Sequence, residues 1–571
     1  MENAQIAQIF DEIADLLELQ EANPFRVRSY RNAARTVRDL SDRLADMAEE
    51  GKDLSKLPNI GQRTGEKIRE ILERGTCSRL EELLEEVPEE LTDLMKVPQL
   101  GPRKAKLLYD TLEVESLDDL RKACEDHRVR DVEGMGAKTE ENILEGIRTL
   151  EATSGRILYR EAADHVESLG RHLDGLDALR RWEAAGSFRR RKETIGDLDV
   201  LVQAADRNKA TDQILDYAAI DDVASRGKEK ATVRLDSGLQ VDFRFFDPEA
   251  FGAALMYFTG SKAHNIALRK RAQQKHWKLN EYGLFKDDHR LAGKTEEAVY
   301  SRLGLPWIPP ELREDRGEVE AAERDEIPEL VELDDIRGDL QAHTHATDGA
   351  HSIEQMAEAA ADRGYAYLAI TDHSKRVSMA KGLDDDATRK HADNIREVDA
   401  KLDDLWLLAG IEVDVLKSGK LDLEEKTLRD LDWVIASIHY DLNLSREKMT
   451  DRLLAAIASG VVHCLAHPLG RIIGKRDPIP IDLDKVFEAC REHGVRMEIN
   501  AQPDRLDLPD TYVKRALEAG VSFTIGTDAH KKSDLDFMAL GVSVARRGWL
   551  EKDAVLNTRT AKQLRKAIQR G

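Results

Sequence analysis

The chain has little cysteine and no long apolar segment, and each shortage excludes a class of protein. Its four cysteines, Cys77, Cys124, Cys464 and Cys490, show no Cys-x-x-Cys spacing, so we expect no disulfide framework and a reducing compartment. No stretch approaches the roughly 18 to 20 apolar residues of a membrane span, and the opening residues lack the basic and apolar blocks of a signal peptide. The sequence predicts a soluble, cytoplasmic protein, which we expect to be a monomer.

Positive charge is also in deficit. The net charge of −23 argues at first against a nucleic-acid partner, because phosphate binding usually shows as a basic balance. The charge is uneven, however: residues 311–337 hold twelve acids and four arginines, whereas residues 262–280 hold six Lys or Arg and no acid. We therefore expect an extended acidic linker and a separate basic groove in a chain long enough for several domains.

The first 150 residues read as helical and contain one pattern three times, at 57–63, 97–103 and 132–138. Each copy has a glycine before a helix-like stretch, with Gly61 and Gly101 in the first two. The pattern looks like the helix-hairpin-helix module, in which backbone N–H groups at a helix N-terminus hold a DNA phosphate without reading sequence. The third copy fits a purely structural turn equally well.

A carboxylate set follows in a region of mixed strands and helices. Gly-Ser-Phe-Arg-Arg (186–190) precedes Gly-Asp-Leu-Asp (196–199), and Asp242 lies in a later apolar run. Asp197 and Asp199 should share one face of a strand, because the side-chain period of a strand is two. Their neighbours are apolar, so a solvated acidic face explains them poorly, and we expect two Mg²⁺ ions to neutralise the three acids.

Seven short apolar runs alternate with helix-like stretches in the C-terminal part, at about 339–343, 367–371, 406–412, 433–438, 461–466, 495–500 and 521–527. Six of them carry potential metal ligands at or just past their ends: His343, His345, His351, His373, Glu412, His439, His467, Asp528 and His530. A single histidine is more often structural, as we expect for His463 inside a run. Nine ligands after successive strands instead predict a multinuclear metal site on one rim of a barrel.

These motifs carry a family resemblance over nearly the whole chain. Residues 1–310 resemble the family X DNA polymerases, whose best-known member is DNA polymerase beta, and residues 338–571 resemble the PHP (polymerase and histidinol phosphatase) phosphoesterases. The resemblance implies all-α helix-hairpin-helix domains, an α+β nucleotidyltransferase palm with a thumb, and a distorted (βα)7 barrel. The implied domains are a lyase-like domain at 1–85, a fingers-like domain at 86–150, the palm at 151–258, the thumb at 259–310, the linker at 311–337 and the PHP domain at 338–571.

The resemblance also implies roles for the polymerase residues. Asp197, Asp199 and Asp242 correspond to the catalytic metal-binding aspartates, with Asp242 placed to help deprotonate the primer 3′-OH. Two departures stand out: Arg191 replaces the glycine that usually follows the two arginines, and Gln240 replaces an arginine of the animal enzyme. The implied nucleotide contacts are Gly186, Ser187 and Arg190 for the phosphates, Tyr257, Phe258 and Gly260 for the sugar, and Asn265 for the base, with Arg269 on the template side.

At the front of the chain, Asn23–Tyr30 resembles the segment that holds the 5′-phosphate of a gap, which makes Tyr30 a candidate DNA contact. Lys67 falls where the family's lyase domain has its Schiff-base lysine. A catalytic amine must be partly deprotonated, and the cationic Arg63 one turn away could bring this about. The alternative, a phosphate-binding or solvated helix lysine, is the one we favour.

In the barrel, the resemblance assigns the nine ligands to three metals. His343, His345, Glu412 and Asp528 match the first; Glu412, His439 and His467 match the second; His351, His373 and His530 match the third. Asp348, Asp372 and Asn500 are expected to orient the imidazoles. We expect Mn²⁺, with Zn²⁺ or Fe as alternatives, because a His, Asp and Glu set without Cys does not demand zinc.

The function expected is DNA repair by filling short gaps, with a barrel that trims the 3′ end as a 3′–5′ exonuclease, or acts as a 3′-phosphatase or abasic-site endonuclease. The partners would be gapped or nicked DNA and dNTPs. Three other functions stay open: a non-catalytic scaffold for DNA ends, a small-molecule phosphatase of the histidinol-phosphate type with a DNA-binding extension, and template-independent nucleotide addition.

Overall fold

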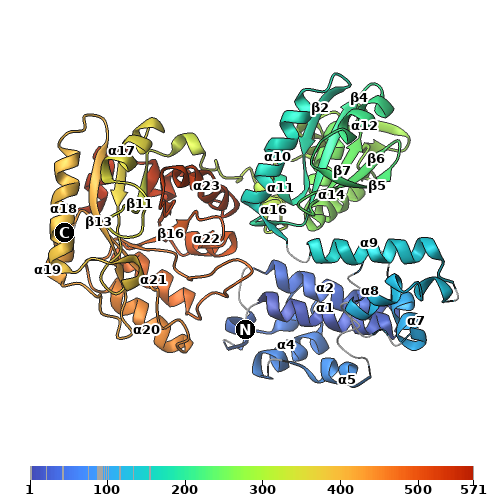
Figure 1. The fold of residues 1–571 in the computed structure, drawn as a ribbon, viewed down its shortest axis with the longest axis horizontal. Helices are drawn as coiled ribbons and strands as arrows, with labels where there is room; N and C mark the ends of the chain where they lie inside the picture. Colours follow the sequence, from blue (N-terminus) through green and yellow to red (C-terminus); the bar gives the residue numbers. More distant parts are fainter. Residues whose placement is uncertain are drawn as a thin grey trace. The chain divides into compact units, whose positions relative to one another are not determined.

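The structure, a computed structural model (Figure 1), describes residues 3–20, 22–40, 44–49, 51–74, 76–86, 94, 97, 100, 102–112, 114, 117–132, 134–153 and 156–569. It divides into two compact units. The first runs to Arg156 and includes the short segments Ala219–Ala224 and Val233–Gln240, and the second comprises Ile157–Ala218, Ser225–Thr232 and Val241–Gly571. In the described residues, none of the helices has the length and apolar character needed to cross a bilayer.

The N-terminal part of the first unit is helical, as the sequence predicts. Its helices bury one apolar face each around residues such as Ile6, Phe10 and Leu17, which have no exposed surface. The turn before the second helix is set by Asn23, whose side chain caps the helix by accepting from the Phe25 amide at 2.9 Å. The helices are α1 (Asn3–Leu19), α2 (Pro24–Asp39), α3 (Leu44–Glu49), α4 (Gln62–Arg74), α5 (Ser78–Glu86), α7 (Pro102–Leu112), α8 (Leu117–Glu125) and α9 (Ala137–Thr153), with 3-10 turns η1 (Leu54–Lys56) and η2 (Val129–Asp131).

The three repeated glycine patterns lie immediately before helices. Helix α4 begins one residue after Gly61, α7 begins at Pro102, and α9 begins at Ala137, one residue after Gly136. Gly101, the glycine predicted to contact DNA in the second pattern, lies outside the described residues. The predicted hairpin positions and the described helix starts therefore agree.

A five-stranded sheet with strand order β2-β4-β7-β6-β5 follows. Apolar side chains of its interior strand β4, such as Leu198, Val200 and Val202, are fully or almost fully buried. Strand β2 runs antiparallel to β4. The strands are β2 (Leu179–Ala184), β4 (Asp197–Ala204), β5 (Ile220–Arg226), β6 (Lys230–Leu235) and β7 (Gln240–Phe245); a small pair, β1 (Ile157–Leu158) and β3 (Thr194–Ile195), and helices α10 (Tyr159–Asp174), α11 (Gly186–Arg189) and α12 (Arg207–Leu215) accompany them.

The next subdomain combines helices with an antiparallel three-stranded sheet. Buried apolar residues that include Leu268, Val299 and Ile308 form its core. The elements are α13 (Phe251–Thr259), α14 (Lys262–Gln274), β8 (Lys278–Asn280), β9 (Gly283–Lys286), β10 (His289–Ala292) and α15 (Glu296–Leu303). Helix α14 carries most of the basic stretch that the sequence marks as a groove.

Residues 311–337 differ from the extended linker expected from their charge. They contain the 3-10 turns η3 (Pro310–Leu312) and η4 (Leu333–Asp335) and the short helix α16 (Glu318–Glu323). Glu311, Arg313 and Glu318 are buried. Arg313 pairs with Glu296 at 2.6 Å, and Glu318 lies 2.6 Å from Nδ1 of His264. Specific partners elsewhere in the chain therefore fold this acidic segment.

Seven parallel strands in sequential order form the C-terminal barrel, and all seven fall on the predicted runs. A bridge between Ala342 and Ala529, and a 3.2 Å hydrogen bond from the Thr527 amide to Asp339, join the first strand to the last and nearly close the barrel. The strands are β11 (Gly338–Ala342), β12 (Tyr367–Ile370), β13 (Trp406–Asp414), β14 (Trp433–Ser437), β15 (Cys464–Leu465), β16 (Arg496–Asn500) and β17 (Phe523–Gly526).

Helices separate the barrel strands and cover their outer side with small and apolar residues, such as Ala357, Ala360 and Met449. They are α17 (Ile353–Asp362), α18 (Asp385–Asp399), α19 (Glu425–Arg429), α20 (Arg446–Ile457), α21 (Leu483–His493), α22 (Asp510–Glu518), α23 (Met538–Arg547) and α24 (Ala561–Ile568), with 3-10 turns η5 (Ser378–Ala380), η6 (Lys532–Phe537), η7 (Lys552–Ala554) and η8 (Leu556–Thr558). His463 packs on Trp433, with ring centroids 5.1 Å apart, and accepts from the Val434 amide, so its structural role is confirmed.

Candidate metal centres

Three aspartates meet on neighbouring strands of the five-stranded sheet. Asp197 and Asp199 begin β4 and share a face, and Asp242 lies on β7, the next strand. Asp242 is buried; it accepts a hydrogen bond from Thr232 Oγ1 at 2.7 Å, and the Lys230 ammonium lies 2.7 Å from it. Asp197 is exposed. The predicted strand positions therefore do produce an acidic cluster with one open edge.

Burial makes a negative charge on Asp199 costly. The pKa of Asp199 is raised from 3.8 to about 6, first because the carboxyl is withdrawn from water and second because Asp197 repels it. The Arg244 guanidinium opposes this effect, since it lies 3.2 Å from Asp199 and 2.8 Å from Asp242. The carboxylates repel one another and already attract the Arg244 guanidinium. Such a set of oxygen ligands suits a hard divalent ion such as Mg²⁺.

The glycine turn before β4 lies against these aspartates. Gly186 has a φ of +63°, and a Cβ at that position would lie 3.0 Å from Asp199 Oδ2, so only glycine fits well. The Ala185 amide donates to the Asp199 carbonyl at 2.8 Å, which holds the turn beside the strand. Ser187 follows Gly186 in the short helix α11. Two of the three residues predicted for phosphate binding, Gly186 and Ser187, thus lie in the turn that adjoins Asp199.

Two arginines complete the turn. The Nε of Arg190 lies 3.0 Å from Glu314, and one of its terminal nitrogens donates to the Thr259 carbonyl. Arg191, at the position where a glycine was expected, has a φ of +54°. It adopts the left-handed conformation that glycine favours, so the turn keeps its shape despite the larger side chain.

The predicted sugar and base contacts surround the end of α13. The Phe258 ring lies under the Arg244 guanidinium, 4.5 Å from its centroid, and Gly260 ends the helix with a φ of +71°. Asn265 is almost fully buried and donates to the Tyr257 carbonyl at 2.7 Å. The predicted template-side residue Arg269 stacks over the Tyr257 ring at 5.6 Å. Their roles in substrate binding stay predictions.

The N-terminal candidates lie in the first unit. Tyr30 packs on Phe10 with ring centroids 6.0 Å apart, and Gly61 is exposed before α4. Lys67 is partly exposed, and its ammonium donates to the Arg63 carbonyl at 3.4 Å. A lysine that bonds to its own helix on a partly exposed face fits the solvated alternative at least as well as a catalytic role.

Glu412 is the centre of the second site, at the C-terminal rim of the barrel. One of its oxygens lies 2.9 Å from His467 and 3.4 Å from His439, and the other lies 3.4 Å from His343. His343 also lies 3.0 Å from Asp528. Five predicted ligands from five different strand ends therefore converge, as parallel strands in a barrel require.

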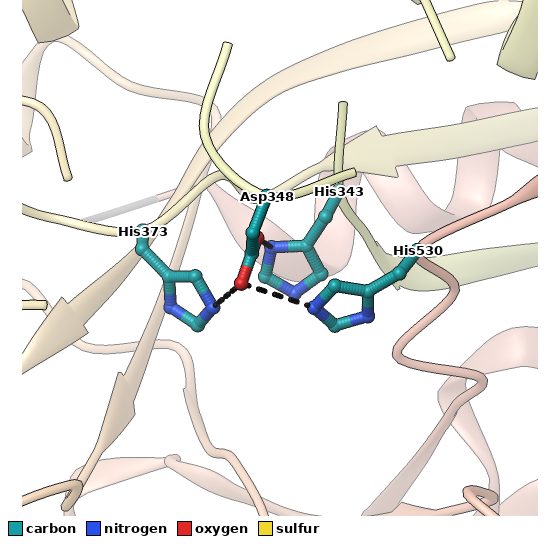
Figure 2. Close-up of side chains that lie close together, drawn as sticks. All are labelled: His343, Asp348, His373 and His530. Atoms are coloured by element: carbon teal, nitrogen blue, oxygen red, sulfur yellow. Dashed lines mark ion pairs between the residues drawn. The ribbon is translucent and has the colours of Figure 1, made fainter. Parts of the chain in front are cut away.

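A second group of imidazoles surrounds Asp348 (Figure 2). Its carboxylate lies 3.4 Å from His373, 3.5 Å from His530 and 3.9 Å from His343. Burial opposes protonation of His530, but Asp348 and Asp528 outweigh it and raise the pKa of His530 to about 10. Asp348, expected only to orient imidazoles, is thus itself placed as a potential ligand.

His345 and His351 are positioned differently. The groups of donor atoms lying within 4.8 Å of one another in the described residues contain neither of them. The two histidines are joined by a hydrogen bond from the His345 amide to the His351 carbonyl at 2.9 Å, and His345 is exposed. They lie on the loop that follows β11, and their predicted role as ligands stays a prediction.

Buried histidine nitrogens that lack hydrogen bonds indicate that the barrel site is suited to bind a metal. Within the described part of the chain, a buried ring nitrogen of His351 and one of His467 have no hydrogen-bond partner, and those of His343 and His373 face carboxylates without a well-formed hydrogen bond. Such atoms are costly to bury unless something binds them, and imidazole nitrogens beside carboxylates are ligands for Mn, Zn or Fe. His467 and Asp528 also have positive φ angles of 29° and 52°, a strain that concentrates at functional sites.

Sequence reasoning missed two acids behind these ligands. Glu498 accepts from the His467 amide at 2.8 Å and from the Asn500 side chain at 3.2 Å, and burial raises its pKa well above the usual range. Asp414 accepts from the His439 amide at 3.0 Å. Glu498 lies two residues before Asn500 in one strand, and Asp414 lies two residues after Glu412 in another. Because alternate residues of a strand share a face, this spacing could have identified both acids from the sequence. Asn500 donates to Asp528 at 3.1 Å, the orienting role expected for it.

Models of known families match most of the chain. The helix-hairpin-helix domain matches residues 1–77, and the SAM-like helix-hairpin-helix tandem matches residues 91–149. The DNA polymerase beta palm matches residues 156–242, and the DNA polymerase beta thumb matches residues 254–314. The PHP domain matches residues 339–502.

Similar whole proteins agree with these matches. A protein of Bacillus subtilis strain 168 described as DNA polymerase/3′-5′ exonuclease PolX is 37% identical over 574 residues, which cover 100% of both chains. A probable phosphatase of Thermoanaerobacter strain X514 is 29% identical over 236 residues, 39% of this chain and 91% of its own length. A probable phosphatase of Vibrio parahaemolyticus is 29% identical over 248 residues, 42% of this chain and 95% of its own.

Proposed function

Because the chain belongs to the PolX family of DNA polymerases, in which a polymerase beta-like palm and thumb are joined to a PHP domain, we propose that it fills short gaps in DNA during repair and trims 3′ ends. The observation that carries the proposal is that one chain holds two separate groups of potential metal ligands. Three aspartates lie on adjacent strands beside a glycine turn, and carboxylates and imidazoles converge on the barrel rim. The domain boundaries derived from the sequence are part of the proposal.

In the polymerase reaction, the primer 3′-OH attacks the α-phosphate of a dNTP in line and releases pyrophosphate. Asp197, Asp199 and Asp242 would hold two Mg²⁺, which supply charge neutralisation and a lowered pKa of the attacking hydroxyl. Asp242 accepts the proton of that hydroxyl. Ser187 and Arg190 hold the β and γ phosphates, for which a guanidinium is suited because it offers paired donors.

In the hydrolytic reaction, the barrel removes the 3′-terminal nucleotide of a strand. Glu412, Asp528 and the surrounding imidazoles would hold up to three divalent cations, with Mn²⁺ preferred, and these supply an activated water and neutralise the phosphate. Asn500 orients Asp528 through their hydrogen bond. Asp348 would serve as a further ligand, because its carboxylate lies 3.4 Å from His373 and 3.5 Å from His530.

DNA binding would use the helical unit and the basic helix α14. The hairpin turns at Gly61 and Gly101 would hold phosphates on either side of a gap, and Tyr30 would contact the 5′ side. Lysines and arginines of residues 262–280 would follow the backbone of the template and primer. These contacts do not depend on base sequence, which suits an enzyme that meets gaps anywhere in a genome.

One assay tests both activities. A labelled primer in a duplex with a one-nucleotide gap is incubated with Mg²⁺ or Mn²⁺, with and without dNTPs, and the products are resolved on a denaturing gel. Replacing Asp197 and Asp199 by Ala should abolish extension and spare shortening, and replacing His343 and His345 by Ala should do the reverse. Loss of both activities in either double variant would show that the two sites do not work separately.

A second candidate activity, removal of a 3′-phosphate, is favoured by the similarity to shorter probable phosphatases. It needs only that the barrel site accept a phosphomonoester. A gapped duplex whose primer ends in a 3′-phosphate should then become extendable after incubation without dNTPs.

Lyase activity is tested by trapping an abasic 5′ end with borohydride, and unchanged trapping by Lys67→Ala would remove Lys67 from the mechanism.

A further inference from the structure

A barrel residue reaches the turn that is proposed to bind the triphosphate. Arg547, the last residue of α23, is only 3% exposed. One of its terminal nitrogens donates to the carbonyl of Arg190 at 2.6 Å and lies 3.1 Å from Glu314. The other lies 2.6 Å from Asp510, at the start of α22 of the barrel. A single buried guanidinium therefore connects the PHP domain to the backbone of the polymerase turn.

The contact continues to the side chain of Arg190. Glu314, which accepts from Arg547, lies 3.0 Å from the Nε of Arg190. A further nitrogen of Arg190 donates to the Thr259 carbonyl. The contacts with Glu314 and with the Thr259 carbonyl thus determine the plane of the Arg190 guanidinium, because its five donors form a rigid fork. Glu314 is itself held by Arg547 of the barrel.

The backbone of this turn needs support from outside. Arg191 has a φ of +54°. For a residue with a Cβ, this left-handed conformation is roughly tenfold less favourable than the right-handed one. Its side chain donates to Ser543 of α23 at 3.1 Å and lies 3.4 Å from Glu311. Barrel residues therefore contact two consecutive residues of the turn, Arg190 through its carbonyl and Arg191 through its guanidinium.

The charged groups around Arg547 are buried and shift one another's pKa values. Burial lowers the pKa of Lys192, whereas Glu314 and Asp510 have pKa values held below their usual range by the surrounding cations. Glu314 is shared by Arg190 and Arg547, and Asp510 is shared by Arg316 and Arg547. Arg547 therefore contacts both acids, and its contact with Glu314 leads on to Arg190.

We propose that Arg547 of the PHP domain is a positioning residue for nucleotide binding at the polymerase site. By holding the Arg190 carbonyl and Glu314, it fixes the turn and orients the Arg190 guanidinium toward the incoming triphosphate. The barrel thereby sets the affinity of the polymerase site for dNTPs while taking no part in the transfer itself. The inference rests on the proposed polymerase activity.

The test uses the full-length chain and measures dNTP binding as well as turnover. Arg547→Met removes the donors and keeps much of the side-chain volume. We expect the KM for the dNTP in gap filling to rise about tenfold, because a buried hydrogen-bonded charge is lost, while kcat changes less than about threefold. Equilibrium binding of the dNTP to enzyme on a dideoxy-terminated primer should weaken by the same factor. Arg547→Lys, which keeps the charge, should recover part of the loss.

Arg316→Met is the matched control, because Arg316 pairs with Asp510 at 2.9 Å across the same interface. Equal increases in KM for both variants, or no increase for Arg547→Met, would overturn the proposal. If Arg547→Met does not fold, as lost 3′–5′ activity would show, Glu314→Gln decides: a raised KM supports the proposal and an unchanged one refutes it. A wild-type chain without extension would instead refute the proposed function.

Discussion

Protonation of Asp199 should control metal binding at the polymerase site near neutral pH. Its pKa of about 6, against an ordinary 3.8, corresponds to about 3 kcal/mol of unfavourable interaction in the ionised form, from burial and from the repulsion of Asp197. The folded-state pKa is raised, so between about pH 4 and 6 the folded protein binds more protons than the unfolded chain, and its stability without metal falls as pH rises through that window. A bound cation reverses this cost, because it needs the ionised carboxylate.

The consequence is a pH profile that can be calculated. At pH 7 the ionised fraction of Asp199 is about 90%, and at pH 5 it is about 10%. With subsaturating Mg²⁺, the single-turnover rate of gap filling should therefore fall about tenfold from pH 7 to pH 5, and saturating Mg²⁺ should move the midpoint to lower pH. Isothermal titration should show about half a proton released per Mg²⁺ bound at pH 6.

A variant separates Asp199 from other titrating groups. Arg244 lies 3.2 Å from Asp199 and lowers its pKa. Arg244→Gln removes that cation and should move the midpoint of the profile upward by about one pH unit, whatever its effect on the maximal rate. A flat wild-type profile between pH 5 and 7 at low Mg²⁺, or an unmoved midpoint in the variant, would refute this account of the site.

Three further predictions concern other parts of the molecule. Asp528→Asn should reduce 3′ shortening at least about 100-fold and leave gap filling within about twofold on the same preparation, because it removes a barrel ligand far along the chain from the aspartates. Arg191→Ala should be less stable to urea than Arg191→Gly by about 1 kcal/mol, since both lose the same guanidinium and only Gly favours a φ of +54°; equal stability would contradict the strain. Glu498→Gln should keep its melting temperature within about 3 °C, because burial raises the pKa of Glu498 and so favours the neutral form that Gln resembles; a large drop would show that Glu498 is ionised.

The sequence predicted the parts of the fold that depend on short-range pattern. Apolar runs located all seven barrel strands, and the order of strand and helix implied the convergence of His343, Glu412 and Asp528 at one rim. The period of a strand likewise placed Asp197 and Asp199 on one face. In these cases chain geometry alone determines where a side chain points, so no distant partner had to be known.

The sequence could not predict which charges would be buried, because burial of a charge depends on partners remote in the chain. Residues 311–337 read as a solvated linker from their acids alone. In the structure, Glu311 pairs with Arg546, 235 residues away, at 2.8 Å, and Arg313 pairs with Glu296. A buried ion pair offsets its desolvation only with good geometry and further hydrogen bonds, so the structure of such a segment depends on its partners. Charge composition therefore indicated an extended linker where ion pairs with residues remote in the sequence bury part of the segment.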